Sequence, residues 1–318
     1  MWQLEEKFYQ EEINEELQDF TEQILKVMTQ QREVLKEKIL NALKELIAKI
    51  DNSSETACIY FSLLKIGIVN QSYELLIEAY GERWVLEPLG YYEISVKELF
   101  DELDHLRYKW HQRSKKYVGK VRAWAIESFI LSQMDKFEDY FIYYLTQWLM
   151  QWDETESFMS LNKSKRLGIY FGDYKNKMAP VFIYEQSEGI KDVVINQIPP
   201  EKMVTFSQWR DINMQEIEIK NKDLSCATYK RSLLKDITFT ECTMTLSNFK
   251  NIKISHCQFD FCDLKLSDFS YGSLEEVVFK ECQLDKIDFS KTHCRNVKII
   301  DKGGVFQLNE GGEGEILE

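Results

Sequence analysis

A five-residue period runs through the C-terminal third of the chain, from Met214 to Ile299. Every fifth residue in this range is apolar, without a single shift of register. An ordinary helix repeats every 3.6 residues and a strand every two, so neither produces this pattern. A fixed repeat outweighs local propensity and predicts a solenoid of stacked coils. The repeated positions, called centres below, are Met214, Ile219, Leu224, Tyr229, Leu234, Phe239, Met244, Phe249, Ile254, Phe259, Leu264, Phe269, Leu274, Phe279, Leu284, Phe289, Cys294 and Ile299.

A second set of mostly small residues lies two positions before many of the centres, and Asp or Asn often falls between the two. Units such as CDLKL, SDFSY, IDFSK and SNFKN resemble the pentapeptide-repeat family, over about residues 212–299. The resemblance implies a right-handed quadrilateral β-helix with four pentapeptides per coil, in which the centre and the residue two before it point inward. The small set is Ala227, Ser232, Cys242, Ser247, Cys257, Cys262, Ser267, Gly272, Cys282 and Thr292, with Asp223, Asn248, Asp263, Asp268 and Asp288 between.

A four-sided coil predicts that residues 20 apart stack in β-ladder contact. The centres then form two largely aromatic columns, which alternate with two largely aliphatic ones. Four to five coils at the ladder spacing make a short rod of roughly 20 Å. Its apolar ends need covers, for which we expect Trp209 and Met214 at one end and residues 301–309 at the other. The aromatic columns are Tyr229, Phe249, Phe269, Phe289 and Phe239, Phe259, Phe279, Ile299.

The N-terminal half has a different, helical pattern. Apolar residues recur at three- or four-residue steps over 14–50, which is typical of a long amphipathic helix. Capping-box spacings predict further helices that begin near Ser53 and Val96, and an aromatic-rich helix is expected over 118–152. We interpret residues 1–155 as a helical bundle whose apolar stripe forms a core, the alternative being a partner groove.

The chain is therefore expected to combine α and β domains in sequence. Residues 168–184 contain two β-rich, aromatic runs around a polar turn and predict a hairpin or small sheet. The predicted organisation is a helical bundle over 1–155, a β-rich connector over 156–208, the β-helix over 209–300, and a cap with a disordered acidic tail over 301–318.

Composition limits the compartment and the partners. The net charge of −13 argues against broad attraction to nucleic acids or anionic membranes. The N-terminus MWQLEEKFYQEE lacks the features of a signal peptide, and the most apolar stretch, residues 57–69, is too short to span a bilayer. We therefore expect a bacterial, cytoplasmic protein without direct contact to membranes or nucleic acids.

The cysteines and histidines do not predict a metal or catalytic site. Six of the seven cysteines lie in the repeat region, and no CxxC pair is present. Cys242, Cys262 and Cys282 form one inward column, which we interpret as small buried hydrophobes, a metal or redox role being the alternative. His105 and His111 are six apart, so they do not share a helix face as the two His of a zinc helix do. With no nucleotide or hydrolase motif either, we predict no cofactor and no enzymatic activity.

Two functions remain, and the charge of the repeat separates them. The family resemblance implies that a member can mimic duplex DNA and protect DNA gyrase from an inhibitor. Residues 221–300, however, contain 12 Lys and Arg against 11 Asp and Glu, so the repeat lacks the negative charge of a phosphate backbone. We therefore favour a non-enzymatic adaptor or scaffold that binds an unidentified protein, with gyrase protection as the alternative.

Four apolar residues are candidates for that protein-binding surface. Phe261, Leu266 and Tyr271 each follow a centre by two positions, where the chain faces outward, and Leu246 lies 20 residues before Leu266. Together they predict an exposed apolar belt around one coil, and such patches mark interaction sites. The belt could instead pack on the helical part of the same chain or on a second subunit.

Overall fold

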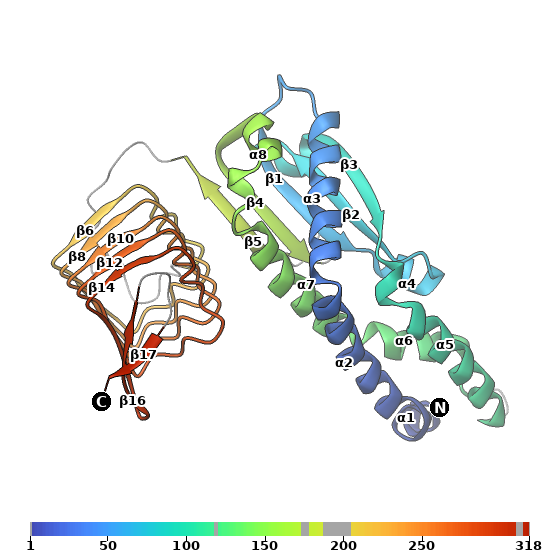
Figure 1. Ribbon diagram of the computed structural model, residues 1–318. Helices are drawn as coiled ribbons and strands as arrows, with labels where there is room; N and C mark the ends of the chain where they lie inside the picture. Colours follow the sequence, from blue (N-terminus) through green and yellow to red (C-terminus); the bar gives the residue numbers. More distant parts are fainter. Residues whose placement is uncertain (1, 118–119, 173–177, 187–204, 310–313, 318) are drawn as a thin grey trace. The chain divides into compact units, whose positions relative to one another are not determined.

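The computed structural model describes residues 2–117, 120–172, 178–186, 205–309 and 314–317. The chain divides into two compact units, residues 1–182 and 183–318 (Figure 1). Each unit is described by itself. No described helix is both long and apolar enough to cross a membrane.

The helices of the first unit agree in part with the predicted ones. The amphipathic pattern of 14–50 forms two helices, α2 and α3, because the helical geometry is interrupted at Gln31. The helix expected over 118–152 is likewise two helices, α6 and α7. The predicted start near Val96 is a 3-10 turn, Lys97–Leu99, which leads into α5. The helices are α1 Trp2–Phe8, α2 Asn14–Gln30, α3 Arg32–Lys49, α4 Lys65–Asn70, α5 Asp101–Ser114, α6 Ala123–Leu131, α7 Met134–Leu149 and α8 Glu156–Ser160, with a π-helix at Tyr9–Ile13.

The interpretation of residues 1–155 as helices alone is wrong, because the first unit contains a five-stranded sheet of order β3-β2-β1-β4-β5. The predicted helix near Ser53 is absent. The Ser53 backbone N–H instead donates to the Asp51 carboxylate in a turn, and strand β1 follows. The two β-rich runs over 168–184 belong to the same sheet rather than to a separate connector. The strands are β1 Thr56–Leu63, β2 Glu74–Tyr80, β3 Pro88–Ser95, β4 Lys163–Gly172 and β5 Met178–Glu185.

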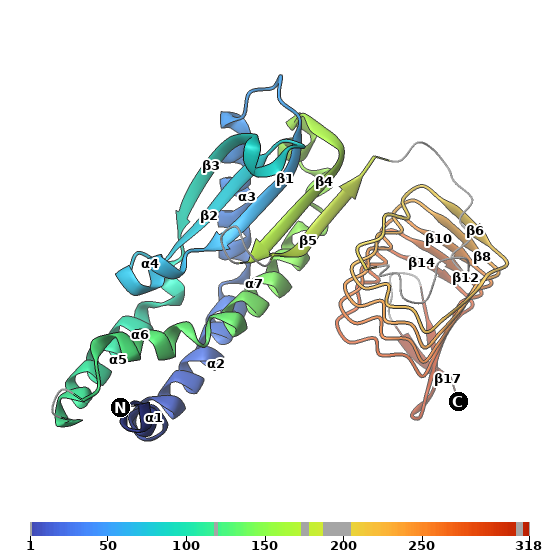
Figure 2. The ribbon, with the colours of Figure 1, turned by 180° about the vertical axis from the view of Figure 1, so that it is seen from behind.

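Helices α3 and α7 cover one face of this sheet, as Figure 1 shows. Figure 2 shows the sheet from its opposite face. Strand β1 is antiparallel to β2 and parallel to β4. Alternate residues of the three central strands, such as Phe61, Ile77 and Ile169, are completely buried, as the period of a strand requires. Phe171 of β4 stacks on Phe141 of α7 at 5.2 Å between ring centres. The core of the first unit thus lies between the sheet and its helices.

The second unit is the predicted four-sided β-helix. Two of its sides are parallel sheets, β14-β12-β10-β8-β6 and β15-β13-β11-β9-β7, the latter extended by β16 and β17. Every parallel ladder pair joins residues 20 apart, as in the pairing of Phe259 with Phe239 and Phe279. The strands are β6 Asn213–Gln215, β7 Glu218–Lys220, β8 Leu233–Lys235, β9 Thr238–Thr240, β10 Lys253–Ser255, β11 Gln258–Asp260, β12 Ser273–Glu275, β13 Val278–Lys280, β14 His293–Arg295, β15 Val297–Asp301, β16 Gly304–Leu308 and β17 Gly314–Leu317.

The predicted aromatic columns form the core of the β-helix. Ring centres are 4.6 Å apart between Tyr229 and Phe249, and 4.3 Å apart between Phe249 and Phe269. In the other column, Phe239, Phe259 and Phe279 stack at 4.8 and 5.0 Å. These centres are completely buried, so the five-residue period reports a stacked apolar interior.

The ends of the β-helix agree with the expected covers in part. Met214 is buried and Trp209 packs against the core. At the far end β16 turns back antiparallel to β15, and its Leu308 joins the core. The prediction of a disordered tail is wrong for Gly314–Leu317, which forms β17 on the free edge of β16. Residues 310–313 and 318, which also belong to the predicted cap and tail over 301–318, lie outside the described residues.

The chain turns each corner of the coil with the same backbone conformation. Every fifth residue from Phe206 to Asn296 has a φ between 50° and 60°, and from Glu216 on each of these residues lies two positions after a centre. We call these residues the corner positions. This left-handed region favours Gly and Asn and costs other residues roughly 1 kcal/mol. The corners nevertheless carry many large side chains, which point away from the core.

Candidate protein-binding surface

The predicted belt residues all occupy corner positions, but they are not equally exposed. Phe261 and Tyr271 are 56% and 50% exposed, whereas Leu266 is half-buried. Leu246 is only 9% exposed, so its predicted exposure is wrong. Residues 20 apart occupy the same corner in successive coils, and we call such a set a corner column. In the corner column of Leu246 the neighbours one coil to either side are Cys226 and Leu266, which are both apolar. The structure therefore offers two separate exposed aromatic corners, not a continuous belt.

Phe261 has acidic neighbours on both sides in its corner column, and the basic Lys280 pairs with Asp260 in the ladder beside it. Glu241 and Glu281 occupy the same corner one coil to either side, and all three residues have left-handed φ values. Asp260 precedes Phe261 and accepts two hydrogen bonds of 2.8 Å from the Gln258 side chain. We call Glu241, Asp260, Phe261 and Glu281 the acidic edge.

Tyr271 lies half a coil away from Phe261, at the opposite corner, and its neighbours are basic. Lys291 Nζ donates to the Tyr271 hydroxyl at 3.0 Å and lies 4.8 Å from the ring centre. Lys250 Nζ lies 5.5 Å from the same ring centre. Arg231, two coils away in the column, forms a bidentate pair with Asp211 through two 2.7 Å hydrogen bonds. We call Arg231, Lys250, Tyr271 and Lys291 the basic edge.

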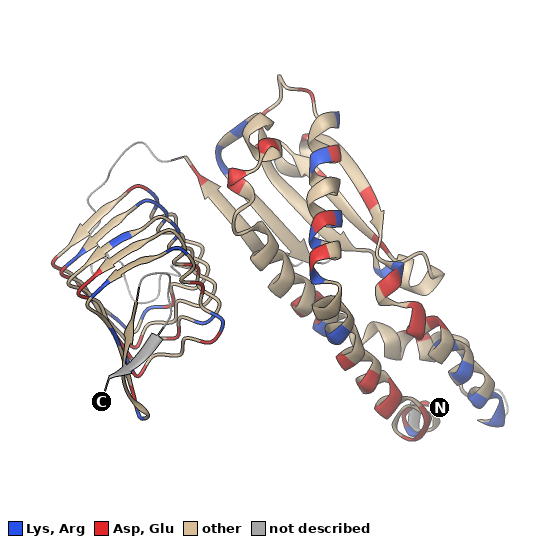
Figure 3. Ribbon diagram, in the orientation of Figure 1, with Lys and Arg blue, Asp and Glu red and all other residues tan. Residues whose placement is uncertain are grey.

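The side of the β-helix that immediately precedes the corner column of Tyr271 in the chain is largely buried. Its outward residues Asn248, Asp268 and Ser270 are buried, and Lys230 is 0% exposed. Both blue and red residues are scattered along the ribbon of the β-helix in Figure 3, so no charge of one sign covers the whole unit. The corners that carry Phe261 and Tyr271 are therefore more exposed than this side.

The cysteine column is inward, as predicted. The thiols of Cys242, Cys262 and Cys282 donate to backbone carbonyls of the neighbouring coil at 3.2–3.5 Å. All seven cysteines are free, and the described part of the chain holds no group of three His, Cys, Asp or Glu residues placed to bind a metal ion. Burial raises the pKa of Cys257 to about 11. A hydrogen bond from Cys262 instead lowers the pKa of Cys282, which is only half-buried.

Iodoacetamide is expected to alkylate Cys282 in the folded protein more than ~10-fold faster than Cys257, because the thiolate is the reactive form and each pKa unit changes its fraction tenfold. The rates are measured by peptide mass spectrometry after quenching at successive times. In urea the two rates should converge, and equal rates in the native state would contradict the prediction.

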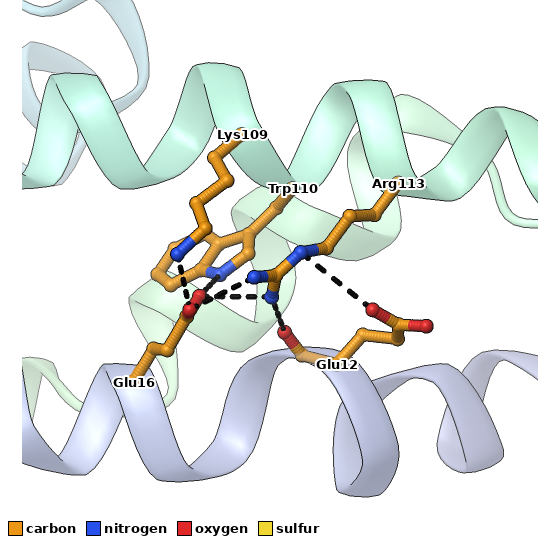
Figure 4. A network of polar contacts seen from close by, with 5 residues as sticks. All are labelled: Glu12, Glu16, Lys109, Trp110 and Arg113. Carbon is orange, nitrogen blue, oxygen red and sulfur yellow. Dashed lines mark hydrogen bonds and ion pairs between the residues drawn. The ribbon is translucent and has the colours of Figure 1, made fainter.

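A polar network in the first unit went undetected in the sequence because it joins distant segments. Glu16 of α2 accepts from Lys109 Nζ at 2.5 Å, from Trp110 Nε1 at 2.8 Å and from Arg113 at 2.9 and 3.0 Å (Figure 4). Arg113 also donates to the Glu12 carbonyl at 2.8 Å, in the π-helix. Burial raises the pKa of Glu16, but these hydrogen bonds outweigh it and leave the pKa below its ordinary value. The network holds α2 against α5.

Acid is expected to destabilise the first unit partly through Glu16. Its folded pKa is lowered, so its contribution is complete above the ordinary pKa of about 4.3 and is lost as the pH falls through the lower folded value. Because the carboxylate is partly exposed, we expect about 1 kcal/mol after solvent screening. Glu16→Gln should therefore lower the urea midpoint at neutral pH and flatten its acid decline. Glu11→Gln is the matched control, since Glu11 pairs with Lys7 at an exposed position; equal effects of the two variants would refute the role of Glu16.

The ladder register and buried columns define the second unit as a four-sided β-helix built from pentapeptides. Residues 232–302 match the family model of the pentapeptide repeat region, so this part of the chain is a pentapeptide-repeat domain. No curated protein matches the chain.

Solved structures of pentapeptide proteins are also similar to this chain. Rfr23, a pentapeptide repeat protein from the cyanobacterium Cyanothece 51142, is 10% identical over 31% of this chain and 86% of its own, with a TM-score of 0.14. Two trypsin-treated variants of QnrB1, a plasmid-mediated fluoroquinolone resistance protein, are 16% identical. They cover 35% and 34% of this chain and 74% and 71% of their own, with TM-scores of 0.12. At these TM-scores the likenesses carry no weight in the assignment, which rests on the register and the family model.

Proposed function

We propose that this protein is a non-enzymatic scaffold whose β-helix binds a protein partner at the corner that carries Phe261. The observation that carries the proposal is the exposure of this phenylalanine at a left-handed position. An exposed Phe there costs free energy twice, through its backbone conformation and through its hydration. Burial of the ring against a partner would recover the hydration part of that cost.

The surroundings of Phe261 favour a protein rather than a nucleic acid as the partner. Its neighbours in the column are Glu241 and Glu281, which repel phosphates and would attract a basic surface. Half-buried Leu266, one corner further along the same coil, supplies a second apolar contact. The stacked ladder beneath fixes both side chains on a rigid support, which lowers the entropy lost on binding.

Protection of DNA gyrase is the second function predicted from the sequence, and no feature of the described surface favours it. A mimic of duplex DNA needs rows of negative charge. Here Lys and Arg number 12 against 11 Asp and Glu over residues 221–300. A supercoiling assay with quinolone tests this function directly: if the protein restores gyrase activity, mimicry replaces the scaffold proposal.

Photo-crosslinking tests the scaffold proposal. Replacing Phe261 by p-benzoylphenylalanine should yield one dominant crosslinked protein in a native lysate. The control is p-benzoylphenylalanine in place of Asn296, which also lies at a corner position. This control should not yield the crosslinked protein obtained from position 261. Adding Leu266→Lys should abolish the product at position 261 while leaving the thermal transition intact. Identical products at both positions, or none at position 261, would overturn the proposal.

A further inference from the structure

The two exposed aromatic corners of one coil are complementary in charge. Phe261 lies in the acidic edge and Tyr271 in the basic edge, and the ten residues between them make half a coil. The two edges therefore lie on opposite corners of the β-helix and are accessible to different neighbours. We infer that the partner of Phe261 is a second copy of this chain, whose basic edge docks on the acidic edge of the first; this inference rests on the proposed function.

Both edges follow the coil, so neighbouring positions in their two corner columns have the same spacing. Neighbouring residues in a corner column are one ladder step, ~4.8 Å, apart. Glu241 and Glu281 thus flank Phe261 at the spacing at which Lys291 follows Tyr271. Two rods laid side by side with Phe261 against Tyr271 can therefore place Glu281 against Lys291 in the next coil. The acidic neighbours of Phe261 favour a basic partner surface, and the phenyl ring favours an aromatic contact. The basic edge of the same chain offers both, through its Lys residues and Tyr271.

This contact uses different surfaces on the two copies, so it is heterologous. Since the two edges lie on opposite corners, each copy keeps one edge free after docking, and copies add in a row without closing. The interface is small and charged, and exposed charges are screened over about 10 Å at 0.1 M salt. We therefore expect weak association that grows with protein concentration and is lost at high salt.

Sedimentation velocity of the purified full-length chain, alone and without lysate, tests the inference. The weight-average sedimentation coefficient should rise beyond that of a dimer as concentration increases at low salt, and should return to the monomer value at 1 M salt, where the screening length is about 3 Å. A monomer at every concentration would overturn the inference, as would a species that stops at two chains.

Two variants test the pairing of the edges. Phe261→Ser/Glu281→Gln weakens the acidic edge, and Tyr271→Ser/Lys291→Gln weakens the basic edge. Each variant alone should associate at least ~10-fold more weakly, since charge pairing and aromatic burial are both removed. An equimolar mixture retains one intact interface per pair and should form one-to-one complexes that grow no further. Glu276→Gln, at another corner of the same coil, is the matched control.

The outcomes separate this inference from the proposed function. If the mixture stays monomeric, or if the control weakens association as much as the edge variants do, self-docking is overturned. A crosslink from position 261 to a different protein would overturn the inference while the scaffold proposal stands. A crosslink from position 261 to a peptide that contains Tyr271 or Lys291 of another copy would support both. Far-ultraviolet circular dichroism verifies that each variant is folded.

Discussion

Replacing Phe269 with alanine is expected to destabilise the β-helix by about 3–5 kcal/mol, the usual effect of removing a buried phenylalanine. Its ring centre lies 4.3 Å from that of Phe249 and 5.4 Å from that of Phe289, and it meets Phe279 edge-on at 6.0 Å. The substitution opens a cavity in the middle of the stack. Because domains are stable by only about 5–15 kcal/mol, the thermal transition of the second unit should fall by many degrees. Circular dichroism of the β signal measures it.

Phe261→Ala is the matched control for that experiment, since it deletes the same side chain eight residues earlier in the same coil. Phe261 lies at an exposed corner, so its loss should change stability by less than about 0.5 kcal/mol. Equal destabilisation by the two variants would mean that the corner side chain is part of the core, which would remove the basis of the proposed binding surface.

Replacing Arg107 with alanine is expected to destabilise the first unit by about 3–5 kcal/mol, the typical result of leaving buried charges without their partner. The guanidinium is buried and donates to Asp104 at 2.8 Å, to the Tyr73 hydroxyl at 2.9 Å and to the Ile68 carbonyl at 2.8 Å. Its Nε also lies 3.1 Å from a Glu127 carboxylate oxygen. Tryptophan fluorescence in urea measures this transition, because six of the seven tryptophans belong to the first unit.

A double variant distinguishes a charge effect from a loss of packing. Arg107→Met/Glu127→Gln keeps the volume and removes one unpaired carboxylate, so it should be more stable than Arg107→Met alone. Arg32→Ala removes an arginine from an exposed position and should have little effect. If Arg107→Ala and Arg32→Ala shift the urea midpoint equally, the buried network does not stabilise the unit.

The β-helix was readable from the sequence because one rule determines every coil. Each centre enters the same interior, so Leu224 and Phe279 obey the same five-residue spacing although their side chains differ. Strand β1 has no comparable signal. Its segment TACIYFSL is buried on both faces, so the alternation that identifies a half-exposed strand is missing. The nearby capping-box spacing then favoured a helix.

The candidate surface was predicted only in part, for two physical reasons. Apolarity at a corner does not determine exposure, since the neighbours one coil away decide it: Leu246 has Cys226 and Leu266, whereas Phe261 has two glutamates. The sequence contained this difference in its 20-residue columns. The network of Glu16 was beyond sequence reasoning, because it joins residues 97 positions apart and depends on how α2 meets α5.

The 20-residue ladder also has a consequence for how the second unit folds. Every pairing between neighbouring coils spans the same short stretch of chain, so each closes a loop of the same entropic cost. Topologies with short sequence separations fold quickly, and solenoids can nucleate at any repeat and propagate to their neighbours. The best-packed coils, around Phe249 and Phe269, are the natural nucleus. During translation these coils leave the ribosome before strands β15 and β16, which close the far end, have been synthesised. The β-helix can therefore begin to fold before its C-terminal end exists.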